Sequence, residues 1–545
     1  MDTKRLAMQI GAAMFLAAAC GAVSAAPAPI IIGACPYTIS APGFYEVQGS
    51  LTTSANCINI AAKNVTLGID GTLINTSSQP TGTGILIEHS ATGAVIVGHA
   101  GLAANINFFA TGVEDKAGDA TIDDIAINYS GKTGLLLAGA DPVATMADDI
   151  TVSGGNQSGR TGVLVSSAYG ARLSNINVGE VGGDGIVLAS AGSLLVNAAS
   201  IQNGGTDIRI EGSNNVIASC GEGYGGAYGV AIALGAKGNI ITGCSTTNGQ
   251  STGRFDGYDA NKKCGTNLWF GNSFKSASKA CVSNSVPAGA TAISGCRTIS
   301  AGGKYYLSAE LTTLNGDCLR VKAANVLLDF NGHVLNGKST GTGLVVEAPA
   351  TGFRGFNGGM QTFATGAEID AAGAVLAEFN DVFDNAQTGV SVNTADDVSV
   401  MDVNPSMSGA IGISVFNSGR TMLASDNASQ SGRAGIFLGH SSQVLLSQSS
   451  GAGGKDGIFV GCTPPAEYAK ACSGDLRDVV ALSAGGDSQY GIAVAAGAND
   501  NVIAASSGSG TTTDDVYDGN AGCAKNLWFY DSFSTTNNAA CMNQP

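Results

Sequence analysis

The sequence predicts an all-β solenoid, in which short parallel strands wind into a coil and each turn stacks on the turn before it. One observation is a signature of a small residue, glycine and an apolar–x–apolar run, which recurs at Gly389, Gly412, Gly435 and Gly457. The regular spacing of about 23 residues suits one turn of a coil made of short strands. The other observation is a much longer repeat of about 260 residues, which returns whole segments of the chain.

The first 25 residues read as a secretory signal. Lys4 and Arg5 precede an apolar run, and small residues lead up to a cleavage site expected after Ala25. A lipoprotein signal through Cys20 is an alternative, which the preceding alanines fit poorly. No later stretch is apolar for long enough to span a bilayer. We therefore expect a secreted or periplasmic protein without a membrane span.

The composition indicates a folded, acidic chain. It has 26 basic and 42 acidic residues, a formal net charge of −16, and 79 glycines. A negative surface argues against nucleic acid and anionic membranes as partners. The mean hydropathy of +0.18 argues against disorder, because disordered chains lack apolar surface to bury.

Each short repeat contains two or three alternating apolar runs separated by Gly, Asn, Asp and Ser, as in "DVSVMDV" from Asp397. Alternation over four to six residues is typical of strands, and the separators form turns. A unit of this length is too short for a two-helix repeat, and the leucine-rich consensus is absent. A coil of parallel strands remains.

Twelve cysteines follow the signal, an even number that favours disulfides in an exported protein. Several lie one coil apart, which brings their strands within the distance that a disulfide bridges. The spacing predicts six local pairs: Cys35–Cys57, Cys220–Cys244, Cys264–Cys281, Cys296–Cys318, Cys462–Cys472 and Cys523–Cys541.

The long repeat predicts two tandem modules, residues 26–285 and 286–545. Each ends in one aromatic segment, "CGTNLWFGNSF" from Cys264 and "CAKNLWFYDSF" from Cys523, which hold Trp269 and Trp528. Because an open solenoid end exposes strand edges and apolar core, we expect the two tryptophans to cap their modules. The alternative is a pair of sugar-stacking platforms.

The repeated "GI-x-L/V" coils, the Asn-bearing turns and the closing "C-x-x-N-L-W" segments resemble secreted bacterial right-handed parallel β-helix proteins of the pectate-lyase-like superfamily. The resemblance covers nearly all of residues 35 to 545. It implies a right-handed coil and a lateral groove that faces carbohydrate. The catalytic segments of polygalacturonase-type and epimerase-type members are incomplete in this chain.

Candidate ligand contacts are carboxylates and arginines near the coil strands. Paired aspartates could act as acid and base or hold calcium, although they also suit polar turns. An arginine followed one coil later by an aspartate could grip an acidic sugar, although a surface ion pair explains it equally well. The candidates are Arg160 with Asp184, Arg433 with Asp456, and the single carboxylates Asp149 and Asp397.

The sequence leaves two functions open. The first is an exported β-helix that binds carbohydrate or cell-envelope glycans without catalysis and without a cofactor. The second is a polysaccharide lyase or glycoside hydrolase that acts on an acidic polysaccharide in a lateral groove. The four histidines, His89, His99, His333 and His440, have no metal-ligand spacing and are interpreted as structural.

Overall fold

The computed structural model describes residues 28–99, 104–154, 160–223, 226–246, 255–462, 476–523 and 525–542. The expected signal lies outside these residues. Within them, the chain is a right-handed parallel β-helix, and every ladder between its strands is parallel. The predicted all-β fold class is confirmed.

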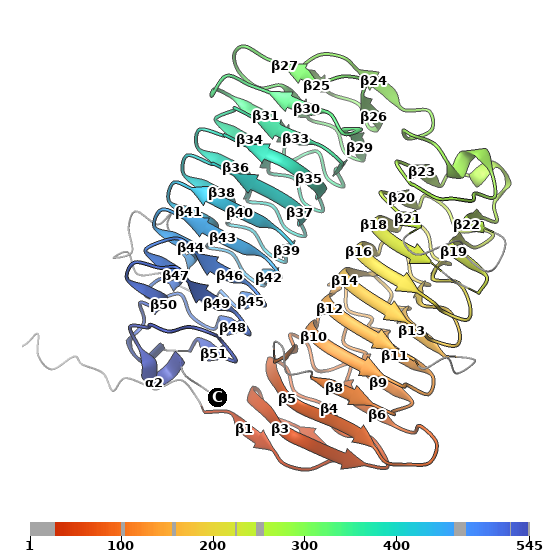
Figure 1. Ribbon diagram of the computed structural model, residues 1–545, viewed down its shortest axis with the longest axis vertical. Helices are drawn as coiled ribbons and strands as arrows, with labels where there is room; N and C mark the ends of the chain where they lie inside the picture. Colours follow the sequence, from red (N-terminus) through yellow and green to blue (C-terminus); the bar gives the residue numbers. More distant parts are fainter. Residues whose placement is uncertain are drawn as a thin grey trace, which may run out of the picture.

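The strands form two stacks of coils (Figure 1). The first stack has a 13-stranded sheet, from β1 (Ile30–Ile32) to β23 (Leu268–Phe270), and a 10-stranded sheet, from β2 (Tyr37–Ile39) to β22 (Phe255–Asp259). The second stack has an 18-stranded sheet, from β24 (Thr291–Ile293) to β51 (Leu527–Phe529), and a 10-stranded sheet, from β25 (Arg297–Ile299) to β50 (Asp514–Asp518). The helices described are one short α-helix, α2 (Ala539–Met542), and the 3-10 turns η1 (Lys262–Cys264), η2 (Ala280–Val282) and η3 (Ala521–Cys523).

The register between coils explains the short repeat. In the first stack, β13 (Thr161–Val165) pairs with β15 (Ile186–Leu188), so that Val163 lies beside Ile186, one turn later in the chain. The glycine of the signature lies at the start of the coil strand, as Gly389 does in β36 (Thr388–Asn393). Neighbouring backbone is very close there: a Cβ on Gly389 would lie 2.6 Å from the Gly412 carbonyl oxygen. The alternating apolar residues point inward and form one core in each stack.

The two stacks lie side by side and run in opposite directions (Figure 1). Their 13-stranded and 18-stranded sheets face each other across what we call the seam. The seam is closed by outward-facing apolar side chains of both sheets. At one end, the Phe44 and Phe529 rings are 4.9 Å apart, and at the other Phe270 and Phe356 are 6.3 Å apart. The first coils of the chain therefore pack against its last.

Five disulfides join cysteines that both lie within the described residues, and each matches a pair predicted from the spacing: Cys35–Cys57, Cys220–Cys244, Cys264–Cys281, Cys296–Cys318 and Cys523–Cys541. The sixth predicted pair includes Cys472, which lies outside the described residues. Disulfides of this number are typical of extracellular or periplasmic proteins. Of the helices in the described part of the chain, none is long and apolar enough to cross a membrane.

Each repeated tryptophan lies in the last strand of its stack, in β23 and β51, and is almost fully buried. The indole N–H of Trp269 donates to the Asp259 carboxylate at 3.0 Å, and that of Trp528 donates to Asp518 at 3.0 Å. Both rings lie against the cores of their stacks. This placement is what a cap needs, and the role itself stays a prediction.

Candidate functional site: the seam

The strands that form the seam run across it, from one edge to the other. In β14 (Ala171–Gly179), Arg172 lies near the start and contacts Asp397 and Arg420, which precede β37 (Ser399–Ser406) and β39 (Met422–Ala424). Three residues later, Asn175 accepts a hydrogen bond from Ser425, which follows β39. Strand starts therefore meet at one edge, and strand ends meet at the other.

The edge with the strand starts is hollowed into what we call the groove. It consists of three adjoining cavities, which share lining residues from both stacks. The first cavity lies beside Phe44 and Lys525, the second beside Asp119 and Arg420, and the third beside Tyr169 and Arg354. The first and second share the lining residues Arg477, Asn64 and Val95, and the second and third share Arg172 and Asp397. The groove therefore follows the seam over many coils.

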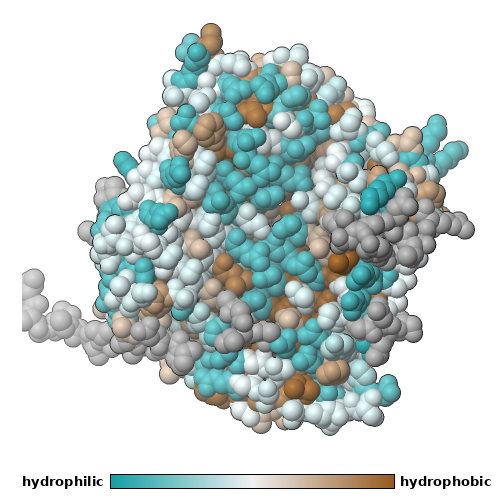
Figure 2. Space-filling view, viewed as in Figure 1, coloured by the Kyte–Doolittle hydropathy of each residue, from teal (hydrophilic) through white to brown (hydrophobic). Residues whose placement is uncertain are grey.

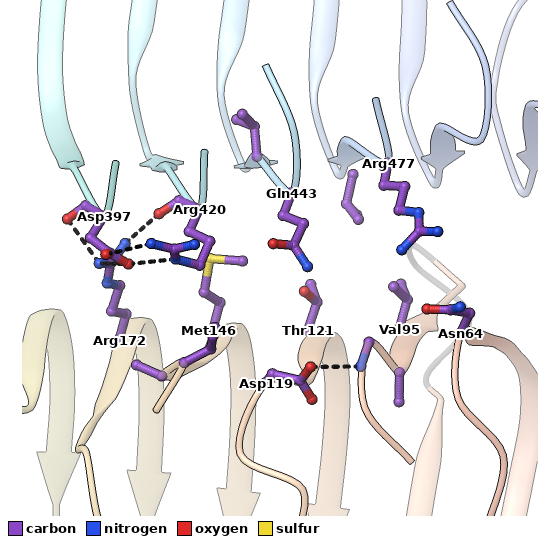
Figure 3. Close-up of a pocket in the computed structure, with 16 residues that line it drawn as sticks. Asn64, Val95, Asp119, Thr121, Met146, Arg172, Asp397, Arg420, Gln443 and Arg477 are labelled. Atoms are coloured by element: carbon purple, nitrogen blue, oxygen red, sulfur yellow. Dashed lines mark hydrogen bonds and ion pairs between the residues drawn. The ribbon is translucent and has the colours of Figure 1, made fainter. Parts of the chain in front are cut away.

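The groove is cationic, although the chain has a formal net charge of −16. Its lining contains five cations, Arg172, Arg354, Arg420, Arg477 and Lys525, against three carboxylates, Asp119, Asp397 and Asp500. Figure 3 shows Arg172 reaching across from the first stack, and Arg420, Gln443 and Arg477 pointing in from the second. Cations gathered in a cleft raise the local concentration of anionic ligands.

One side of the groove is a ladder of corner residues in the second stack. Each lies two positions before a seam strand, and the first five have a left-handed backbone, with φ from 50° to 61°. The ladder is Asp397, Arg420, Gln443, Arg477, Asp500 and Lys525. Because each coil contributes one of these residues, their side chains form a row along the groove.

Arg172 ties the two stacks together inside the groove. Its guanidinium donates to the Asp397 carboxylate at 3.1 Å and to the carbonyl oxygens of Asp397 and Arg420 at 2.8 and 2.6 Å. Arg420 holds the same carboxylate with two bonds of 2.9 and 3.0 Å. Burial alone would raise the pKa of Asp397, but the two arginines outweigh it and hold the pKa below its usual value.

Asp119 is the groove carboxylate whose oxygen atoms are least satisfied by hydrogen bonds. One oxygen accepts the backbone N–H of Gly93 at 2.9 Å, and the other is buried without a hydrogen bond. Burial raises the pKa of this group. A carboxylate that holds a proton more readily, placed in a cationic groove, is a candidate for acid–base work.

The opposite edge of the seam is acidic. Asp123 of β10 (Thr121–Asn128) and Asp148 of β12 (Thr145–Ser153) are fully buried and face one hydroxyl, that of Ser447, at 3.1 and 2.6 Å. Burial raises the pKa of Asp148 to about 7 and that of Asp123 well above its usual value. Since a hydroxyl donates only one hydrogen, the two carboxylates are best satisfied when one is protonated.

Beside these carboxylates lies a polar trough with a volume of about 420 Å³. Side-chain amides and one carboxylate dominate its lining: Asp149, Asn175, Asn177, Asn197 and Gln448. Figure 2 shows hydrophilic side chains along the line between the two stacks. Asp149 has a left-handed backbone with φ 47°, and Asn175 and Asn197 have one with φ 51°. Asp149 therefore occupies the corner position that asparagine occupies on the next two coils.

The structure places the predicted arginine–aspartate pairs away from the seam. Asp184 is bonded to Arg209, one coil later, at 3.0 Å, while Arg160 is buried and donates to the Gly154 carbonyl oxygen. Asp456 is buried beside Ala434, whereas the neighbouring Arg433 is exposed. In the second pair, the register sets Asp456 beside Ala434, the residue after Arg433, so the arginine and the aspartate do not lie side by side.

Of the six candidate contacts, the structure brings Asp397 into the groove and Asp149 into the trough. The sequence reasoning missed Arg172, Arg354 and the rest of the cationic row. The ladder spacing, one coil from Asp397 to Arg420 and one more from Arg420 to Gln443, is visible in the sequence. The facing of the two stacks is not, since Arg172 and Asp397 are 225 residues apart.

Calcium is the one metal that the paired aspartates of the sequence suggest. Within the residues that the structure describes, no group of three or more His, Cys, Asp or Glu side chains is arranged to hold a metal ion. His99 lies at the end of the seam, where its ring stacks on Tyr530 at 4.2 Å and it bonds Asp70 at 3.2 Å.

The fold and the groove define a parallel β-helix protein with a cationic cleft between two stacks. No protein-family model matches the chain, and no curated protein matches it. Among solved structures, it is similar to the tailspike protein of E. coli bacteriophage HK620 in complex with pentasaccharide, with 10% identity over 81% of this chain and 74% of that chain and a TM-score of 0.31.

Two epimerases are also similar to it. The A-module of Azotobacter vinelandii mannuronan C-5 epimerase AlgE4 has 10% identity over 85% of this chain and 86% of that one, with a TM-score of 0.18. A mutant of the periplasmic alginate epimerase AlgG has 9% identity over 83% and 76%, with a TM-score of 0.19. Similarity at this level carries no conclusion about activity.

Proposed function

We propose that the protein is an exported β-helix protein of the pectate-lyase-like superfamily, which binds an acidic polysaccharide or envelope glycan along the groove. The observation that carries this proposal is the row of five cations in a cleft of an otherwise acidic chain. Four come from the second stack and one from the first, so a ligand in the groove would contact both.

The shape of the groove suits a linear polymer. Three cavities in a row offer successive subsites, and their floor contains apolar side chains such as Phe44, Met146 and Val479. Arginine binds carboxylates through two parallel hydrogen bonds, which gives geometric selectivity as well as charge. Arg477 and Lys525 are exposed and can reach a ligand without rearrangement of the seam.

Binding of a polyuronate and of a neutral polysaccharide of equal length tests the proposal. Polyuronate affinity should fall with rising salt, and the double substitution Arg477→Gln with Lys525→Gln should weaken it about tenfold or more. The matched control removes two exposed lysines outside the groove, Lys116→Gln with Lys322→Gln. Equal binding of the neutral polymer, or equal loss in the control, would contradict a specific cationic groove.

Asp119 favours a second function, a lyase that acts on the same polymer. A β-eliminating lyase needs a base near the sugar and a cation that neutralises its carboxylate, and the groove holds both kinds of group. Cleavage would release unsaturated products that absorb in the ultraviolet. Absorbance that grows with the native protein and is lost in Asp119→Asn would establish catalysis, and binding without absorbance would leave the binding function alone.

A further inference from the structure

The third cavity of the groove differs from the other two in its lining. It has a volume of about 240 Å³ and is lined by Arg172, Asp397 and Arg354 together with the ring of Tyr169. Two arginines therefore face one carboxylate. Tyr169 precedes β14 of the first stack and Arg354 lies in β32 (Arg354–Phe356) of the second, so the cavity exists only where the stacks meet.

Arg354 is held in apolar surroundings. The register sets it between Leu327 and Val375 of the neighbouring coils, and both of these belong to the apolar cluster of the seam. Two residues later on the same strand face, Phe356 contacts Phe270 of the first stack. The guanidinium is therefore partly desolvated, and burial lowers its pKa.

The guanidinium of Arg354 also lacks a counter-charge. Its Nε is buried without a hydrogen bond, and its one hydrogen bond, to the Gly352 carbonyl oxygen, is long at 3.4 Å. The carboxylate of the cavity, Asp397, is already engaged by Arg172 and Arg420. In the part of the chain that the structure describes, no carboxylate forms an ion pair with Arg354. An incoming anion would satisfy donors that the protein leaves unused.

Tyr169 supplies the second half of the cavity. Its side chain is 53% exposed, and it has no aromatic neighbour among the described residues. An exposed aromatic face beside a polar cleft offers an apolar surface with a polar tip, which suits the C–H face of a sugar ring. Charge and aromatic face are thus on opposite stacks, across one cavity.

We propose that this cavity is a subsite for a single carboxylate-bearing sugar residue, with Arg354 bonded to the carboxylate and Tyr169 against the ring face. The inference rests on the proposed function, since it assigns one residue of the bound polymer to one place in the groove. It also predicts that the protein binds free uronic acids, which monosaccharides alone can test.

Titration of the purified protein with free galacturonate or glucuronate, followed by NMR or calorimetry, tests the subsite, with galactose and glucose as neutral matches. Arg354→Met should weaken uronate binding about tenfold or more, because it removes a charge-assisted hydrogen bond. Arg354→Lys should restore part of the affinity, since the charge returns without the planar fork. Tyr169→Ala should weaken binding several-fold, and Tyr169→Phe should not.

The matched control is Arg320→Met, an arginine of the second stack that is paired with Asp317 and Glu347 outside the groove. Without ligand, Arg354→Met should keep or raise the melting temperature, because a partly buried, unpaired guanidinium is replaced by an apolar side chain of similar length. Tyr169→Ala changes an exposed residue, so it remains informative if the arginine variants fail to fold.

The outcomes separate the two proposals. If the polymer binds but Arg354→Met and Tyr169→Ala bind it as the native protein does, the subsite is wrong and the groove stands. If uronate binding depends on Arg354 while no polymer binds, the subsite stands and the proposed function fails. If inorganic phosphate competes as well as the uronate, and neither is affected by Tyr169→Ala, the cavity is a general anion site and the subsite is overturned.

Discussion

The two stacks of coils are alike at their closing segments and different along the seam. At the closing segments, Asn267 and Asn526 donate to Asp259 and Asp518 at 3.2 and 3.0 Å, beside the tryptophans that bond the same carboxylates. Along the seam, carboxylates with raised pKa values come from both stacks, such as Asp148 of the first and Glu378 of the second, but the second stack contributes four of the five groove cations. Positions that close a stack are constrained by packing, while positions that face the other stack have diverged.

One divergence is visible immediately after the tryptophan strands. Phe270 and Phe529 both point into the seam, but Gly271 follows the first and Tyr530 the second. The Tyr530 hydroxyl donates to Glu46 at 3.0 Å, and its ring stacks on His99. The last coil of the second stack thus acquires contacts to the first coils of the chain that its counterpart lacks.

Separation of the stacks should have the largest effect. We expect residues 26–285 and 286–545 each to fold alone, because their cores are distinct, and to associate, because the apolar seam becomes exposed. Circular dichroism and analytical ultracentrifugation of each half, alone and mixed, check this. A half without β-type circular dichroism would show that the repeat is not of autonomous modules, and halves that ignore each other when mixed would contradict the seam.

Loss of a closing tryptophan should have the second-largest effect, on the stability of the fold. Trp528→Ala should lower the free energy of unfolding by about 3–5 kcal/mol, as for other buried large aromatics, and Trp269→Ala by a similar amount. Trp528→Phe keeps most of the volume but loses the bond to Asp518, so it should cost less. Denaturant unfolding measures the cost. A stable Trp528→Ala protein that has lost glycan binding would mean that the aromatic segment is a binding site and not a cap.

The coil could be predicted from the sequence, whereas the packing of the two stacks at the seam could not, and both outcomes have physical reasons. Gly389, Gly412 and Gly435 recur because every coil repeats the same close contact, so one period reveals the strand, the register and the nearest disulfide partners. The groove depends on how two finished stacks dock. Nothing local to Arg172 indicates that it meets Asp397, and nothing local to Arg354 indicates that it is buried without a carboxylate.

The buried carboxylates of the seam predict a pH dependence of stability. The pKa of Asp148 is raised by burial from its ordinary value of 3.8 to about 7, and that of Asp124 to about 6. For such groups the folded state binds protons more tightly than the unfolded state. The contribution of each group to the free energy of unfolding is therefore fully present below about pH 4 and is lost as the pH rises toward 7. Asp148→Asn should flatten this slope and raise the melting temperature at pH 8, whereas Glu180→Gln, at an exposed position, should not. A melting temperature that rises between pH 5 and 8 would contradict the assignment.

The smallest effects should come from the arginines that the sequence singled out by its coil pattern and that the structure places outside the seam. Arg433 is exposed on the second stack, and Arg209, which replaces Arg160 as the partner of Asp184, is 45% exposed in its side chain. Because exposed ion pairs contribute little, Arg433→Ala and Arg209→Ala should each change the free energy of unfolding by less than about 1 kcal/mol. Neither residue lines the groove, so both variants should bind a polyuronate like the native protein. Denaturant unfolding and the polyuronate titration, run beside the Arg477→Gln and Lys525→Gln variant, measure both quantities. If Arg433→Ala weakens glycan binding and the groove variant does not, the ligand lies on the outer face of the second stack, where the sequence pattern first placed it.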